Sequence, residues 1–138
     1  MFVLDLSLEK WVGNKNESEF IENPNWSQIE AAIRELDGKS HTLVTLGVDE
    51  DNYMTIGGGE SRRYIVSVTF DNISFHNLVD LSKPDKTEKL VVGGQEGIYP
   101  AKMCVDWLPC LVAARTFAES GKLDSLLSWQ EDESLVLV

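Results

Sequence analysis

The sequence predicts an α+β fold, in which a mainly antiparallel β-sheet of about five to seven strands carries two principal helices. Three observations indicate this class. Residues 53–70 alternate apolar and polar side chains around three glycines, two segments show helical apolar spacing, and turn residues separate several further short apolar runs. No internal repeat, low-complexity segment or linker interrupts the chain, so residues 1–138 are expected to form a single domain.

The predicted centre of the sheet is the stretch 53–70, YMTIGGGESRRYIVSVTF. In its second half, one face of an extended strand carries Tyr64, Val66, Val68 and Phe70. The opposite face carries Arg63, Ile65, Ser67 and Thr69. This period of two predicts a strand with one packed face and one largely solvated face. The glycines at 57–59 allow positive φ, so we expect a tight turn to a shorter strand at 53–56.

The first helix is predicted at about 26–37 from its ends and from its apolar stripe. Asn25 suits an N-cap, and Gln28, three positions later, completes a capping box. Gly38 suits the position just after the last helical turn. The apolar stripe contains Trp26, Ile29, Ile33 and Leu36. This spacing predicts a helix that lies on the sheet.

The second helix is predicted at about 108–120. Pro109 lacks a backbone N–H and is tolerated in the first turn of a helix, and Gly121 suits its end. The expected buried side consists of Cys110, Leu111, Ala114, Phe117 and Ala118. Residues 123–129 are expected to pack back on the core. Two interpretations stay open for 102–106, a core strand or the start of this helix, and two for 134–138, an edge strand or a frayed end.

Shorter apolar runs supply the other strands. The chain opens with an alternating run, one face of which carries Phe2, Leu4, Leu6 and Leu8. Further strands are expected at 42–48, 73–81 and 90–92. The polar segments 13–25 and 82–89 are predicted to be loops, and Glu96-Gly97 is predicted to prolong the turn that begins at Gly93-Gly94.

The chain is strongly acidic, with 23 acidic against 12 basic residues and a formal net charge of −11. Such an excess repels phosphates, so we expect no direct binding of DNA, RNA or an anionic membrane. A basic protein partner fits the sign, although acidic surfaces also serve solubility alone. The N-terminal run MFVLDLSLEK lacks the features of a secretory signal, and no apolar run reaches the length of a membrane span. The expected location is therefore the cytoplasm.

No group of residues in the sequence predicts catalysis or metal binding. His41 and His76 lack partners at ligand spacing, and two cysteines are too few for a zinc site or a disulfide framework. The clusters GGGESRR and GGQEG match no phosphate-binding motif and are better explained as turns. The pair Arg62-Arg63 either binds an anion or forms internal ion pairs, and internal pairing is favoured. We therefore predict no cofactor, no metal and no enzymatic activity.

The four tryptophans divide into two groups. Trp26 belongs to the stripe of the first helix and is expected in the core. Trp11, Trp107 and Trp129 lie at element ends beside acidic residues. Aromatic side chains bordered by carboxylates suit a contact surface for a basic, partly apolar partner. The alternative, which the sequence leaves open, is that they close the edges of the core.

Several motifs, taken in chain order, resemble immunity protein family one of the bacterial polymorphic toxin systems. The first helix contains WxxIxxAIxxLDG, and the strands that follow contain TLVTL and YMTIGGGESxxYIVSV. After these come VVGGQEGxYP, the helix AARTFAESGKLD and a closing Ser128-Trp129. The resemblance covers about residues 26–129. Its glycines, which we regard as fold determinants, are Gly57, Gly58, Gly59, Gly93 and Gly94.

The resemblance implies a non-enzymatic immunity protein that binds and neutralises the C-terminal domain of a cognate toxin in the cytoplasm. The toxins of such polymorphic or contact-dependent systems include nucleases and nucleic-acid deaminases. Their clefts hold a polyanion and tend to be basic, so an acidic surface is complementary to them. The residues expected to contact the toxin are Asp49, Glu50, Asp51, Glu60, Glu96, Trp129, Glu131 and Asp132.

Two other functions stay open from the sequence. A chaperone or adaptor would hold a secreted effector before export and would not protect a cell from that effector. A small enzyme of unrecognised type would need titratable groups clustered in a deep pocket.

Overall fold

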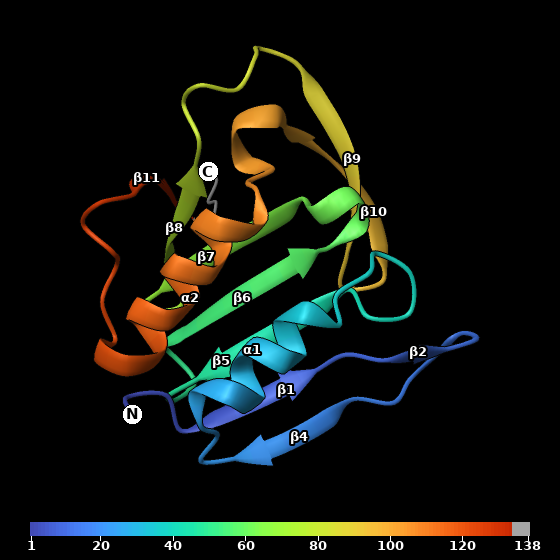
Figure 1. Cartoon of the computed structure of the whole chain (residues 1–138), viewed down its shortest axis with the longest axis vertical. Helices are drawn as coiled ribbons and strands as arrows, with labels where there is room; N and C mark the ends of the chain where they lie inside the picture. Colours follow the sequence, from blue (N-terminus) through green and yellow to red (C-terminus); the bar gives the residue numbers. More distant parts are fainter. Residues whose placement is uncertain (134–138) are drawn as a thin grey trace.

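The computed structural model describes residues 1–133, and one large sheet organises them (Figure 1). Its seven strands lie in the order β11-β8-β7-β6-β5-β1-β4, and each neighbouring pair is antiparallel. These strands are β1 Asp5–Leu8, β4 Glu19–Glu22, β5 Leu43–Gly47, β6 Tyr53–Gly58, β7 Tyr64–Thr69, β8 Ser74–Val79 and β11 Ser128–Glu133. The α+β class predicted from the sequence is confirmed.

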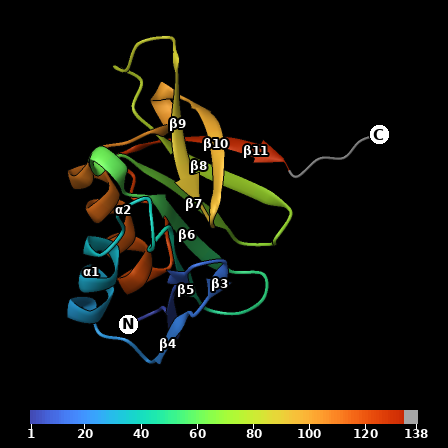
Figure 2. The same cartoon turned by 90° about the vertical axis from the view of Figure 1, so that its right-hand side faces the viewer.

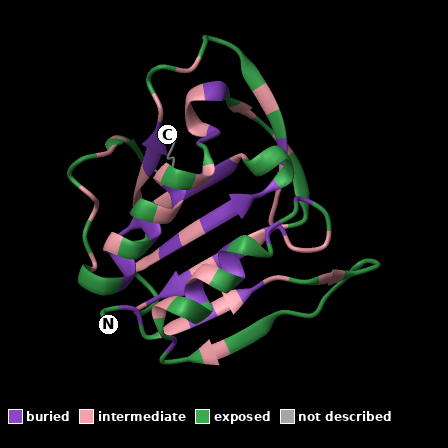
Figure 3. Cartoon of the chain, viewed as in Figure 1, coloured by how far each residue is buried: buried purple, intermediate pink, exposed green. Residues whose placement is uncertain are grey.

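Two helices, α1 (Trp26–Arg34) and α2 (Trp107–Ser120), cover one face of this sheet (Figure 1). The main core lies between them and the sheet, where Ile33 of α1, Ile56 of β6 and Phe117 of α2 are fully buried. Figure 3 shows that buried residues concentrate along the central strands and the inner sides of the helices. Burial of each such side chain contributes about 1.5–3 kcal/mol. This layer therefore holds the fold together.

A separate hairpin, β9 (Thr87–Val92) and β10 (Gln95–Pro100), lies on the opposite face of the sheet (Figure 2). Ile65 of β7 is buried in a small second core under this hairpin. A Cβ atom added at Gly57 would lie 2.4 Å from Val92 Cγ1. The hairpin can therefore pack here only because Gly57 has no side chain. The prediction of a largely solvated second face is therefore wrong at this end of the sheet.

The ends of both helices follow the predicted chemistry. The Asn25 side chain accepts the N–H of Gln28 at 2.9 Å, and the Gln28 side chain accepts the N–H of Asn25 at 3.0 Å, which confirms the capping box. Helix α1 ends at Arg34, earlier than predicted, because from Leu36 onward the N–H groups leave the helical pattern: that of Leu36 bonds to Ile33 O and that of Asp37 bonds to His41 O. Helix α2 ends as predicted, with Gly121 at a φ of 72°.

The connection between β6 and β7 is longer than the predicted tight turn. Gly57 and Gly58 belong to β6, and Glu60–Arg62 form a short 3-10 turn before β7 begins. Gly59 has a φ of 105°, and a Cβ atom there would lie 2.4 Å from the carbonyl carbon of Leu36. Phe70 lies beyond β7 and is 39% exposed, so its predicted place on the packed face is wrong.

Two segments predicted as non-strand pair with neighbours. The predicted loop 13–25 contains β4 and the second strand of a short hairpin, formed by β2 (Trp11–Val12) and β3 (Lys15–Asn16). The predicted turn at Glu96-Gly97 is part of β10, because Gly93 and Gly94 complete the reversal at positive φ. Both segments are polar because they lie at the margin of the fold, where each strand has a single neighbour.

The C-terminal third also differs in detail from the predictions. Residues 102–106 form neither a long strand nor the start of α2: Ala101–Met103 make a 3-10 turn, and Val105 makes an isolated bridge with Tyr64. Leu123, Leu127 and Trp129 pack against the main core as predicted for 123–129. The prediction for 134–138 lies outside the described residues.

Candidate partner-binding surface

Two acidic turns lie next to each other at one end of the sheet. Residues 49–52 join β5 to β6, and residues 70–73 join β7 to β8. The Tyr53 hydroxyl donates a hydrogen bond of 2.6 Å to Asn72 Oδ1, which ties the two turns together. Figure 2 shows both turns projecting on the side of the sheet away from the helices.

An aspartate shapes each of these turns. Asp49 Oδ1 accepts the backbone N–H groups two and three positions later, both at 2.8 Å. Asp71 Oδ1 does the same at 2.9 and 2.8 Å. These bonds stabilise the ionised carboxylates and lower the pKa of both aspartates. The two carboxylates therefore remain charged well below neutral pH.

The edge strand β11 brings further carboxylates to this end. Glu131 lies opposite His76, and Asp132 lies opposite Phe75, near the start of β8. We call the resulting surface the acidic end, and it comprises Asp49, Glu50, Asp51, Asp71, Glu131 and Asp132. All six residues are exposed, and none forms an ion pair with another described residue. Their negative charge is therefore uncompensated locally.

Four charged side chains at the opposite end of the sheet are linked by ion pairs. Arg63 donates to both carboxylate oxygens of Glu88 at 2.9 Å, and its Nε lies 3.4 Å from Asp106 Oδ1. Lys83 Nζ lies 3.0 Å from the same Asp106 oxygen. Internal pairing, favoured for Arg63 from the sequence, is confirmed. These four charges compensate one another, whereas the carboxylates of the acidic end have no described ion pair.

The structure separates two predicted contact residues from the acidic end. Asp49–Asp51 precede β6 and Glu60 follows it, so the six residues of β6, about 20 Å of strand, lie between them. Glu96 lies on β10, in the hairpin on the second face of the sheet. Both side chains are exposed. Of the eight predicted contact residues, the fold gathers Asp49, Glu50, Asp51, Glu131 and Asp132.

Trp129, the eighth predicted contact residue, is half-buried. Its ring packs against the main core, and its indole N–H donates to the carbonyl oxygen of Asp124 at 3.1 Å. Trp11 and Trp107 also have partners within the chain: the Trp11 indole donates to Glu9, and the guanidinium of Arg62 lies 5.1 Å from the Trp107 ring centroid. The rings of Trp107 and Trp129 thus pack at the edge of the main core, and a contact of Trp129 with a partner stays a prediction.

Asp71 is the member of the acidic end that the sequence predictions omitted. Asp71-Asn72 and the run from Asp49 to Asn52 both have residue types that favour turns, but the sequence does not show that the two turns lie next to each other. The signal that relates them is the strand order, because turns on the same side of adjacent antiparallel hairpins lie at one sheet end.

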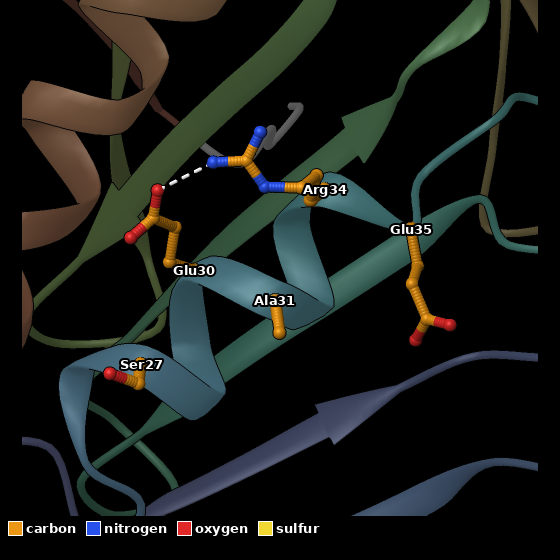
Figure 4. Close-up of a pocket in the computed structure, with 5 residues that line it drawn as sticks. All are labelled: Ser27, Glu30, Ala31, Arg34 and Glu35. Atoms are coloured by element: carbon orange, nitrogen blue, oxygen red, sulfur yellow. Dashed lines mark hydrogen bonds and ion pairs between the residues drawn. The ribbon is translucent and has the colours of Figure 1, made fainter.

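Another surface feature lies on the first helix. A shallow hollow on the outer side of α1 is lined by residues of that helix and by its C-cap Glu35, and Glu30 and Arg34 bond to each other at 2.7 Å (Figure 4). Within residues 1–133, no group of three or more His, Cys, Asp or Glu side chains is placed to hold a metal ion. No helix in this part of the chain has the length and apolar character needed to cross a membrane.

Comparison with known proteins identifies a family whose model covers most of the acidic end. The family model described as Immunity protein Imm1 matches residues 17–131, which span both helices and every strand of the main sheet except β1 and the last two residues of β11. No curated protein and no solved structure matches the chain. The matched segment includes every residue of the acidic end except Asp132. The resemblance deduced from the sequence motifs is thereby confirmed, and the chain belongs to the Imm1 family of immunity proteins.

Proposed function

We propose that this chain is a non-enzymatic immunity protein that binds and neutralises the toxin domain of a polymorphic or contact-dependent toxin system. The observation that carries the proposal is the acidic end, where six exposed carboxylates form no ion pair with another described residue, in a member of an immunity protein family. A surface of this kind attracts and orients a basic protein. The partner we propose is a nuclease or nucleic-acid deaminase domain, because its cleft must hold a polyanion.

The proposed binding occurs in the cytoplasm and has two electrostatic consequences. Association is fast at low salt because the negative end steers the basic cleft toward it. The pairing of particular carboxylates with particular basic side chains of the toxin fixes the relative orientation of the two proteins. In this proposal Glu60 and Glu96 contact basic side chains of the toxin outside its cleft. Trp129 holds β11 on the core and so keeps Glu131 and Asp132 in place.

Co-expression in bacteria tests the proposal. The probe is the C-terminal domain of the protein encoded by the reading frame adjacent to this one, expressed from an inducible promoter with or without this chain. We expect that domain to stop growth alone and this chain to restore growth. A domain that is harmless alone, or toxicity that this chain leaves unchanged, would overturn the proposal.

The same experiment separates the chaperone alternative. A chaperone or adaptor would bind the N-terminal or translocation part of the secreted protein and leave its toxic domain active. A pull-down with each part of the adjacent protein therefore distinguishes the two functions. We expect capture of the C-terminal domain, and capture of the N-terminal part alone would favour the chaperone.

A further inference from the structure

The sheet face opposite the helices carries a row of small polar side chains across five neighbouring strands. Residues directly opposite each other on paired strands point to the same face. This register aligns Ser7, Thr45, Thr55, Ser67 and Asn77, which we call the hydroxyl row. The four hydroxyl residues are partly exposed. Among the described residues, the side chains of Ser7, Thr45 and Thr55 make no hydrogen bond, so their hydroxyls can bind a partner.

The hydroxyl row lies directly beside the part of the face that is covered. The β9–β10 hairpin packs over Gly57 and Ile65, which are paired with each other. Gly57 lies two residues after Thr55 on β6, and Ile65 lies two residues before Ser67 on β7. Figure 2 shows the hairpin standing over one part of this face. On the other side of the row, the strands lead to the acidic end. The hydroxyl row is therefore bordered by a hairpin on one side and by carboxylates on the other.

The charge pattern of this face resembles that of a protein–protein interface. No residue of the hydroxyl row is charged. Two positions further along each strand, toward the acidic end, a second row of paired residues contains Tyr53 and Phe75. In this second row acidic residues occur only on the strands toward the two edges of the sheet, β4, β1 and β11. These acids are Asp5, Glu22 and Asp132. Phe20, which continues the hydroxyl row onto β4, is 61% exposed. An uncharged centre with aromatic neighbours and a charged rim is typical of protein interfaces.

We propose that this open face, centred on the hydroxyl row, docks the toxin domain while the acidic end pairs with basic residues at the rim of the contact. The inference rests on the proposed function and adds which face of the immunity protein makes the contact. Covering Ser and Thr hydroxyls that gain hydrogen bonds is inexpensive, whereas covering unpaired Lys or Glu side chains is not. The row can therefore lie at the buried centre of the complex.

The charges also decide between possible occupants of this face. A second copy of the chain, related by twofold symmetry, would bring acidic rims together and would be repelled. Nucleic acid is repelled for the same reason. A basic protein domain is attracted: its basic side chains contact Asp5, Glu22 and Asp132 while its surface covers the hydroxyl row.

The test is a matched pair of substitutions, Thr55→Arg in the hydroxyl row and Thr87→Arg on the outer hairpin. Both residues lie in strands, and both substitutions add one positive charge. The probe is a catalytically inactivated C-terminal domain of the adjacent toxin. We expect Thr55→Arg to weaken binding at least about 100-fold, because the long cation blocks close contact and is buried without a partner. We expect Thr87→Arg to bind like the wild type.

The outcomes separate this inference from the proposed function. Wild-type protein that fails to bind the toxin overturns both. Wild-type binding that Thr55→Arg leaves unchanged, or that Thr87→Arg weakens equally, overturns the docking face but not the function. Thermal unfolding of both variants confirms that they fold. If Thr55→Arg does not fold, the labelling experiment described next decides the matter.

A cysteine at the same position gives a second readout. Cys104 and Cys110 are buried, and burial raises the pKa of the Cys104 thiol to about 11 and that of Cys110 further, so both are slow to react. The thiol of Thr55→Cys should react with a maleimide in the free protein and be protected at least about tenfold in the toxin complex. Thr87→Cys should react equally in both states. Equal reaction of Thr55→Cys in both states would overturn the docking face.

Discussion

Reversing two charges at the acidic end provides the sharpest test of electrostatic steering. We choose Glu50→Lys with Asp51→Lys and keep Asp49, because the Asp49 carboxylate accepts two backbone N–H bonds that hold the turn. The carboxylates of Glu50 and Asp51 make no hydrogen bond or ion pair with another described residue. The double variant changes the net charge by four units, from −11 to −7, and preserves the turn.

The size of the effect follows from the number of charges and from screening. In water, a unit charge about 10 Å from a partner charge changes the encounter rate about twofold. Four units should therefore slow association about tenfold at 0.01 M salt, where the screening length is about 30 Å. At 1 M salt the screening length is about 3 Å, and the effect should disappear. Because the fold is unchanged, dissociation should change less than association.

Stopped-flow association with the inactivated toxin domain at the two salt concentrations measures this effect. The control is Glu17→Lys with Asp85→Lys, which makes the same change in net charge on exposed segments away from the acidic end. If the control variant slows association as much as the test variant, the net charge of the whole protein, and not the acidic end, determines the association rate. If neither variant slows association at low salt, steering by the acidic end is refuted.

Three further predictions concern the stability of the fold. Asn25→Ala should lower the free energy of unfolding by about 1 kcal/mol in urea denaturation, because it removes the capping box of α1. Gly59→Ala should lower it by more than about 2 kcal/mol in the same assay, because the new Cβ atom meets the carbonyl group of Leu36 at a φ of 105°. Stability measured against pH should fall below about pH 4, because backbone hydrogen bonds, that of Ser74 first, lower the pKa of folded Asp71. Its contribution is present above the unfolded pKa and is lost as the pH falls through the folded pKa, so Asp71→Asn should flatten the profile.

Matched variants show whether these effects have the stated causes. Asn14→Ala changes an exposed asparagine in the β2–β3 turn and should leave the urea midpoint almost unchanged. Gly13→Ala also has a positive φ but meets no atom within 4 Å, so the difference between it and Gly59→Ala isolates the steric contact. An Asp71→Asn profile as steep as that of the wild type would assign the acid sensitivity to other carboxylates.

Local features of the fold could be predicted from the sequence because each depends on neighbouring residues. The capping box of α1 involves residues three positions apart, and the C-terminal end of α2 depends on one glycine. The buried face of β7 follows from alternation within six residues, although Phe70 falls outside it. The family was also accessible, because its motifs are short segments read along the chain.

Polar marginal strands could not be predicted, because pairing rather than composition makes them strands. β4 has glutamate at both ends, and β10 contains glutamate and glycine, residue types that are depleted in strands. Each becomes a strand because one neighbour supplies its backbone hydrogen bonds. The same pairing places β9–β10 over Ile65, which the alternation alone had assigned to a solvated face.

The candidate site divides in the same way. The sequence by itself determined the excess of negative charge, its concentration in the turn at 49–51 and the absence of a catalytic motif. Tertiary structure alone decided that Asp71 and Asp132 join this turn, that Glu60 lies at the other end of β6, and that the hydroxyl row forms an open face. The physical reason is that strand order and register set these distances, and both arise from contacts between segments far apart in the chain.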